Sequence, residues 1–130
     1  MRIVAIVQAR MGSSRLPQKV MADLCGHPAL WHIHDRLRHS RQVDDFVIAT
    51  SGRPENKEIE AFAKRNGIHV FCGSEENVLE RFYLAAKGAD ADVVIRLTGD
   101  NVFVCAEIVD AGVAYFIKEK KLDYLYYREG

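Results

Sequence analysis

The sequence predicts a three-layer α/β domain whose central sheet is doubly wound and mostly parallel. Apolar runs alternate at short spacing with segments of helical periodicity along all 130 residues. The expected strands are nearly unbroken apolar runs, which is typical of parallel strands covered on both faces by helices. No internal repeat, linker or low-complexity stretch interrupts the alternation. We therefore expect a single domain over residues 1–130.

In the first half of the chain, the signals for strands and helices are apolar runs, helical spacing and turn residues. The run Ile3–Val7 predicts a buried strand, and Leu30, Ile33 and Leu37 recur at the spacing of one helix face. The expected elements are strand 2–8, helix 29–39 opened by Pro28, strand 46–50, helix 55–65 closed by Asn66-Gly67, and strand 68–71.

The second half of the chain continues the same alternation. Ser74 is expected to cap a helix that reaches residue 86 and turns Leu79 toward the core. The remaining expected elements are strand 92–98, helix 106–119 with Ile108 and Tyr115 on one side, and a fifth strand beginning at 123–127.

Composition and charge exclude several classes of function. The formal net charge is zero, which argues against broad binding to nucleic acid or to an anionic membrane surface. No apolar run approaches the length of a membrane span, and the opening residues do not resemble a signal peptide. Cys25, Cys72 and Cys105 are widely spaced, so we expect reduced, buried thiols and a cytoplasmic protein.

The loop after the first strand carries the strongest chemical signal. Arg10, Arg15 and Lys19 are three cations within ten residues, and the small residues 12–14 lie between them. Small residues let backbone N–H groups approach an anion, and guanidinium and ammonium groups surround it. This pattern suits a polyphosphate, although a solvated basic turn remains the alternative. The loop matches neither the P-loop pattern nor the glycine fingerprint of dinucleotide-binding proteins.

Further polar residues follow two of the other strands. Thr50-Ser51 ends the second strand and Gly99-Asp100 ends the fourth. Because ligands of open α/β sheets bind at the carboxyl ends of the strands, we expect these residues to lie near the basic loop.

Four motifs together give the chain a recognisable pattern. They are Q-A-R-M-G-S-S-R-L-P-x-K after the first strand, A-T-S after the second, G-S-E-x-x-V-L-x-R-F at the start of a helix, and R-L-T-G-D after the fourth strand. In this order they resemble the cytidylyltransferase-like family of spore coat polysaccharide biosynthesis protein F, which is related to the CMP-Kdo and CMP-sialic acid synthetases.

The resemblance implies a nucleotide-diphospho-sugar transferase fold of Rossmann-like type. It also implies CTP as donor, Mg²⁺ as metal, and a sugar whose hydroxyl attacks the α-phosphorus of CTP while pyrophosphate leaves. By motif match, Arg10, Arg15 and Lys19 hold the triphosphate, Arg15 and Lys19 are the catalytic residues, and Asp100 binds magnesium. The nucleotide-binding residues implied are Gln8, Ala9, Arg10, Met11, Gly12, Ser13, Arg15, Lys19, Thr50, Ser51 and Asp100.

Several of these residues have a plainer interpretation. Asp100 is also placed to cap the following helix, Thr50 to bond to backbone at a strand end, and Lys19 to remain solvated. Arg81, in the G-S-E helix motif, is expected either to reach the site or to form a salt bridge.

The chain departs from the family pattern in sequence and in length. Gln18 stands where the family usually has Gly, and residues 101–106 replace a proline-containing turn beside Asp100. Family members are roughly twice as long, so the chain resembles an amino-terminal half that lacks the acceptor-binding part. The alternatives are therefore an inactive nucleotide-binding remnant or an α/β interaction module. An unfinished sheet also leaves an exposed edge, from which we expect a homodimer.

Overall fold

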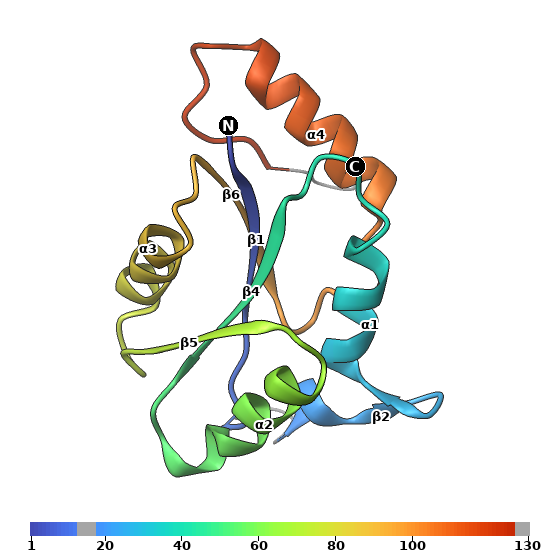
Figure 1. Ribbon diagram of the computed structural model, residues 1–130, viewed down its shortest axis with the longest axis vertical. Helices are drawn as coiled ribbons and strands as arrows, with labels where there is room; N and C mark the ends of the chain where they lie inside the picture. The colour runs from blue at the N-terminus through green and yellow to red at the C-terminus, as the bar shows by residue number, and fades with distance from the viewer. Residues whose placement is uncertain (13–17, 127–130) are drawn as a thin grey trace.

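A parallel sheet of four strands, in the order β5-β4-β1-β6, forms the centre of the computed structural model, which describes residues 1–12 and 18–126 (Figure 1). The strands are β1 (Ile3–Gln8), β4 (Asp45–Ser51), β5 (His69–Gly73) and β6 (Val93–Thr98). The helices are α1 (Ala29–Leu37), α2 (Lys57–Arg65), α3 (Val78–Gly88) and α4 (Ala106–Lys118). The predicted parallel, doubly wound sheet is confirmed.

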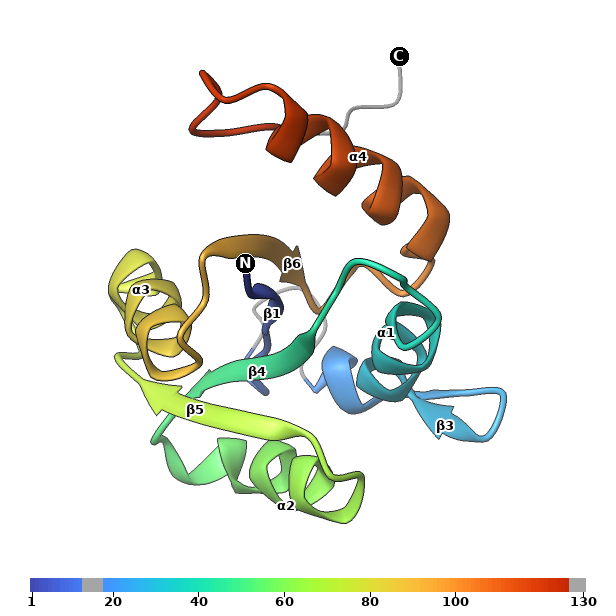
Figure 2. The same cartoon turned by 45° about the horizontal axis from the view of Figure 1, so that its top comes forward.

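The helices cover both faces of the sheet, which makes three layers. On one face, Ala5 and Val7 of β1 pack in a core with residues of α1 and α2, and Val109 of α4 packs against that core. On the other face, Val4 and Ile6 pack against α3. Figure 2 shows α3 on the opposite side of the sheet from α1 and α2. The alternation of neighbouring side chains between two cores explains why β1 is apolar without interruption.

Short elements connect the first strand to α1. A 3-10 helix, Lys19–Met21, is followed by a small antiparallel hairpin of β2 (Asp23–Leu24) and β3 (His27–Pro28). Cys25 and Gly26 form its turn with φ of 53° and 91°, and positive φ at both positions is the geometry that two-residue hairpin turns require.

The start of α3 differs from the prediction. Asn77, not Ser74, is the N-cap, and its side-chain oxygen accepts from the Glu80 N–H at 2.9 Å. Ser74 lies one turn earlier and accepts from the Asn77 N–H at 3.0 Å. Leu79 was expected inside but is 81% exposed. The buried residues of the helix are Arg81, Phe82 and Ala85.

The expected fifth strand is wrong for residues 123–126, which form no strand; residue 127 lies outside the described part of the chain. Tyr124 and Tyr126 are exposed there, with ring centroids 6.2 Å apart. Ile108 and Tyr115 of α4 are also exposed. β6 pairs only with β1 in the described residues, so one of its edges carries no strand.

The cysteines do not form the buried set that was expected. Cys25 and Cys72 are exposed, and Cys105 is half-buried. All three are free thiols. The Cys72 thiol donates to Glu60 at 3.2 Å, a contact that its position in a short apolar run did not reveal.

Across residues 1–12 and 18–126, no helix combines the length and the apolar character needed to cross a membrane.

Candidate functional site

The carboxyl ends of β1 and β6 lie side by side where the winding of the sheet reverses. From β1 the chain moves outward to β4 and β5, and it then returns across the sheet to β6 (Figure 1). This reversal point is where doubly wound sheets bind ligands. The Gly99 N–H donates to the Gln8 carbonyl at 3.0 Å, so the two strand ends remain in contact beyond the sheet.

The loop after β1 is anchored by alternate side chains. Ala9 and Met11 are buried, whereas Arg10 points outward and Gly12 is exposed. The Met11 N–H donates to the Asn56 side chain at 2.9 Å, and the Met11 carbonyl accepts from the Gln18 N–H at 2.8 Å. These two bonds fix where the loop leaves β1 and where it returns.

Lys19 and Asp100 meet at the reversal point. The Lys19 ammonium lies 2.7 Å from the Asp100 carboxylate, which is 63% exposed. A side chain at Gly99 would collide with Val20, so glycine is required for the approach of these two segments. The structure therefore brings together the two residues that the sequence assigned to phosphate and to metal.

The structure excludes one of the two interpretations of Asp100. The N-cap of α4 is Cys105, so Asp100 does not cap that helix. In the described residues no three side chains of the His, Cys, Asp and Glu types are grouped to hold a metal. One exposed carboxylate fits a magnesium ion that arrives with a polyphosphate, because Mg²⁺ commonly takes one or two carboxylates together with phosphate oxygens and water.

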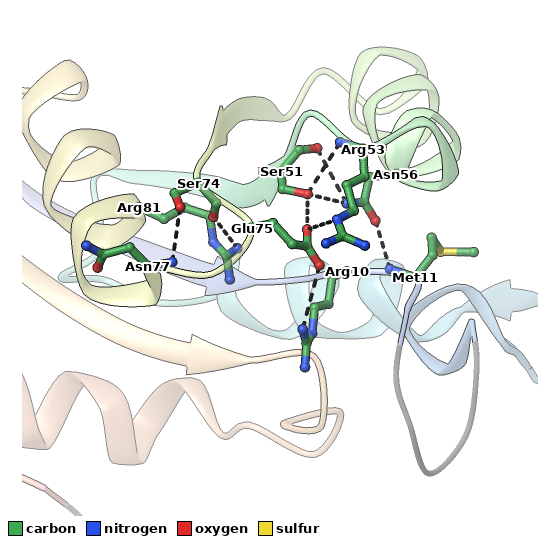
Figure 3. A network of polar contacts seen from close by, with 9 residues as sticks. All are labelled: Arg10, Met11, Ser51, Arg53, Asn56, Ser74, Glu75, Asn77 and Arg81. Carbon is green, nitrogen blue, oxygen red and sulfur yellow. Dashed lines mark hydrogen bonds and ion pairs between the residues drawn. The ribbon is translucent and has the colours of Figure 1, made fainter.

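A second polar network, centred on Glu75, joins the ends of three strands (Figure 3). Its carboxylate accepts from the Ser51 hydroxyl and lies 3.6 Å from the Arg10 guanidinium and 3.8 Å from that of Arg53. Ser51 in turn accepts from the Asn56 amide at 2.7 Å. The network thus couples the loop after β1 to the loops after β4 and β5.

Glu75, Arg53 and Asn56 were not among the predicted site residues. Glu75 lies in the G-S-E motif, which was the available signal. No pattern in the sequence distinguishes Asn56 from any other loop amide. Its importance comes from its burial between Met11 and Ser51.

Thr50 and Ser51 are both buried at the end of β4. Ser51 faces the Glu75 network, whereas the Thr50 hydroxyl has no hydrogen-bond partner among the described residues. Arg81 is fully buried, and its Nη1 donates to the Ser74 carbonyl at 2.9 Å. No salt bridge of Arg81 occurs within residues 1–12 and 18–126. Two predicted site residues, Ser13 and Arg15, lie outside the described residues.

Comparison with known proteins assigns the family. The family model described as Cytidylyltransferase matches residues 4–128. The chain belongs to the cytidylyltransferase family. Its resemblance to spore coat polysaccharide biosynthesis proteins, stated above from motifs, is confirmed by 42% identity to spore coat polysaccharide biosynthesis protein SpsF of Bacillus subtilis, over 95% of this chain and 53% of that protein.

Solved structures agree with this cytidylyltransferase fold. A cytidylyltransferase from Leptospira borgpetersenii superposes with a TM-score of 0.88 at 33% identity, over 93% of this chain and 51% of that one. CMP:2-keto-3-deoxy-manno-octonic acid synthetase complexed with CTP superposes with a TM-score of 0.79 at 25% identity, over 94% and 50% of the two chains. This cytidylyltransferase-like chain thus spans about half the length of the relatives it matches.

Proposed function

We propose that this chain binds CTP with Mg²⁺ for cytidylyl transfer to a sugar in the biosynthesis of a surface polysaccharide. The observation that carries the proposal is the meeting of Lys19 and Asp100 at the reversal point of the sheet, 2.7 Å apart. A metal–polyphosphate needs one cation for its oxygens and one carboxylate for its metal, and both are present at the place where doubly wound sheets bind ligands.

In the proposed reaction Arg10, Arg15 and Lys19 bind the triphosphate and offset the charge that develops on the leaving pyrophosphate. Such transfers depend on positioning and electrostatic stabilisation rather than on covalent chemistry by the protein. Asp100 would hold Mg²⁺, which supplies further charge neutralisation when it is bound. Gln8, Ala9, Met11, Gly12 and Ser13 are proposed to shape the loop around the nucleotide, with Thr50 and Ser51 supporting it from the end of β4.

The support for CTP is the family together with the CTP-bound neighbour. A hydroxyl of the sugar acceptor would attack the α-phosphorus. Because the donor is a nucleoside triphosphate, we place the reaction in the cytoplasm. We also propose a homodimer, because β6 pairs on one side only in the described part of the sheet.

A second candidate function is nucleotide binding without turnover. It is favoured by the absence, in the described residues, of any group of three His, Cys, Asp or Glu side chains that could hold a metal. On this alternative the fold and the phosphate-binding loop are retained, while chemistry requires groups that this chain does not supply.

The test is calorimetric titration of the chain with CTP, with and without Mg²⁺, and with ATP, GTP and UTP for comparison. Binding that prefers CTP and strengthens with Mg²⁺ supports the proposed site. An absence of binding to every triphosphate contradicts both candidate functions. Release of pyrophosphate from CTP in the presence of candidate sugars then separates transfer from binding alone.

A further inference from the structure

The buried guanidinium of Arg81 has no ion-pair partner in the described part of the structure. The residue is fully buried in the second turn of α3, and its Nη1 donates to the Ser74 carbonyl at 2.9 Å. Its Nε and Nη2 atoms have no hydrogen-bond partner among the described residues. An unpaired buried guanidinium is strongly unfavourable, so a second state in which an anion pairs with it is expected.

Glu75 is the carboxylate placed to supply that anion. Burial lowers the pKa of Arg81, the charge of Glu75 raises it, and the charge of Arg10 lowers it. Glu75 follows Ser74 directly, and Ser74 already contacts the guanidinium of Arg81. Pairing with Arg81 requires a change of the Glu75 side-chain conformation and the loss of its bond to the Ser51 hydroxyl.

The present contacts of Glu75 with arginine are long. Its distances of 3.6 Å to Arg10 and 3.8 Å to Arg53 exceed those of hydrogen-bonded pairs. Both arginine side chains are about half exposed, and Figure 3 shows the Glu75 carboxylate directed at Ser51 and these two arginines. Contacts of this kind exchange partners easily when a stronger anion approaches.

The charges around Glu75 do not balance. The guanidinium groups of Arg10 and Arg53 lie near the Glu75 carboxylate, and that of Arg81 bonds to the carbonyl of the adjacent Ser74. The excess positive charge favours an additional anion, and Arg10 is the member of this group that lies in the loop at the reversal point.

We propose that Glu75 holds Arg10 in the nucleotide-free protein, and that Arg81 receives the Glu75 carboxylate when the polyphosphate of a nucleoside triphosphate takes over Arg10. Glu75 and Arg81 are thus positioning residues, and they act on the ligand through Arg10. The inference rests on the proposed function, because it takes Arg10 as a ligand of the polyphosphate.

The test is a double-mutant cycle read by calorimetry with inorganic tripolyphosphate and, separately, with CTP. Glu75→Gln frees Arg10 and is expected to tighten tripolyphosphate binding about threefold, the scale of one exposed ion pair. Arg10→Ala removes that gain. Glu76→Gln, a neighbouring exposed carboxylate, is the matched control and is expected to leave the affinity unchanged.

Substitutions at Arg81 test whether this residue receives Glu75 from Arg10 or only supports the fold. Arg81→Met leaves Glu75 on Arg10, so tripolyphosphate binding weakens by about threefold, again the scale of one ion pair. The same substitution in the Glu75→Gln background has no effect, and Arg81→Lys restores the wild-type affinity. If Arg81→Met does not fold, the Glu75→Gln and Arg10→Ala variants still test whether Glu75 holds Arg10.

The proposed exchange is overturned if Arg81→Met weakens tripolyphosphate binding equally in the wild-type and Glu75→Gln backgrounds. It is also overturned if Glu75→Gln does not tighten that binding. If the variants follow the cycle with tripolyphosphate while the wild-type chain shows no preference for CTP over the other triphosphates, that outcome counts against the proposed function alone. A chain that binds neither ligand overturns both.

Discussion

Gln18 adopts a backbone conformation that is usually occupied by Gly. The motif resemblance led us to expect Gly at this position, and the φ of Gln18, 63°, lies in the left-handed region. The Gln18 N–H closes the loop by donating to Met11 at 2.8 Å. A side chain in that region costs about 1 kcal/mol.

Gln18→Gly is expected to raise the free energy of unfolding. Relief of the left-handed strain contributes about 1 kcal/mol, and the greater freedom of Gly in the unfolded chain offsets part of it. Urea unfolding checks the difference. Gln18→Ala is the control, because it removes the side chain but keeps the strain, and a gain of equal size there would contradict this explanation.

Asp100→Asn is expected to change nucleotide binding in two opposite ways. Loss of the Lys19–Asp100 pair, at 2.7 Å in the protein, frees the ammonium and tightens CTP binding without metal by up to about fivefold, the upper value for a partly exposed pair. The strengthening of binding by Mg²⁺ disappears. Titrations with and without Mg²⁺ measure both effects, and an unchanged response to Mg²⁺ would place the metal elsewhere.

Arg15→Ala is expected to weaken CTP binding more than Arg38→Ala does. Arg38 is an exposed residue paired with Asp35 on the surface at 2.8 Å, so its loss is expected to leave the ligand unaffected. A direct guanidinium–phosphate contact is charge-assisted and contributes about 1.5–3 kcal/mol. Equal effects of the two substitutions in calorimetry would refute the assignment of Arg15 to the triphosphate.

Cys72 is expected to react slowly with alkylating reagents although it is exposed. Burial of its sulfur and the hydrogen bond to Glu60 raise the pKa of this thiol to about 11. Because the thiolate is the reactive form, alkylation at pH 8, followed by mass spectrometry, should modify Cys25 before Cys72. Glu60→Gln should accelerate the reaction at Cys72, and a rate unaffected by that substitution would contradict the role of Glu60.

At the scale of elements, α4 is held to the loop after α1 by one carboxylate. Asp110 accepts from the Ser40 hydroxyl and from the Arg41 and Gln42 N–H groups at 2.9 and 3.2 Å. Burial raises the pKa of Asp110, but these hydrogen bonds and the charge of Arg41 outweigh burial and lower it overall. The helix was predicted from its periodicity, whereas this attachment joins residues about seventy positions apart and left no local pattern.

Asp110→Asn is expected to lower the free energy of unfolding at neutral pH by about 1–3 kcal/mol, the scale of hydrogen bonds to a charged acceptor. The pKa of Asp110 is lower in the folded than in the unfolded protein. Its contribution to stability is therefore present above the ordinary pKa of 3.8 and is lost as the pH falls through the pKa of the folded state. Urea unfolding from pH 7 downward should show the wild-type and variant curves converging. Glu107→Gln, exposed on the same helix, should show no such convergence.

At the scale of the whole molecule, the sheet ends at β6 in the described residues. Side chains of β6 on the α3 face are exposed, among them Val94 and Arg96. The prediction of a fully covered sheet holds for β1, where both neighbours are strands, and fails at β6, which has one. An apolar run in the sequence does not reveal whether its strand is central or lies at an edge.

Val94→Lys is expected to reduce self-association. A charged residue on an edge strand opposes pairing with a second chain, and Val94 is 40% exposed. Sedimentation velocity over a range of concentrations measures the change. Ile95→Val, on the covered face of the same strand, is the control. A wild-type chain that is monomeric throughout would contradict the proposed homodimer.

The sequence by itself determined the alternation of strands and helices, the polar loop after β1 and the family of the chain. Hydrophobic periodicity and short motifs are local properties, so they can be recognised in the sequence without a structure. This is why Arg10, Lys19 and Asp100 could be proposed from residue types, their places after strands and the motif resemblance.

Only the tertiary structure decided which of these residues meet. The order β5-β4-β1-β6 places Asp100 beside Lys19, and hydrogen bonds through Ser51 join Asn56 and Glu75 in one network. The physical reason is that ion pairs and buried hydrogen bonds depend on distances between segments far apart in the chain, and these distances are set by how the sheet is wound.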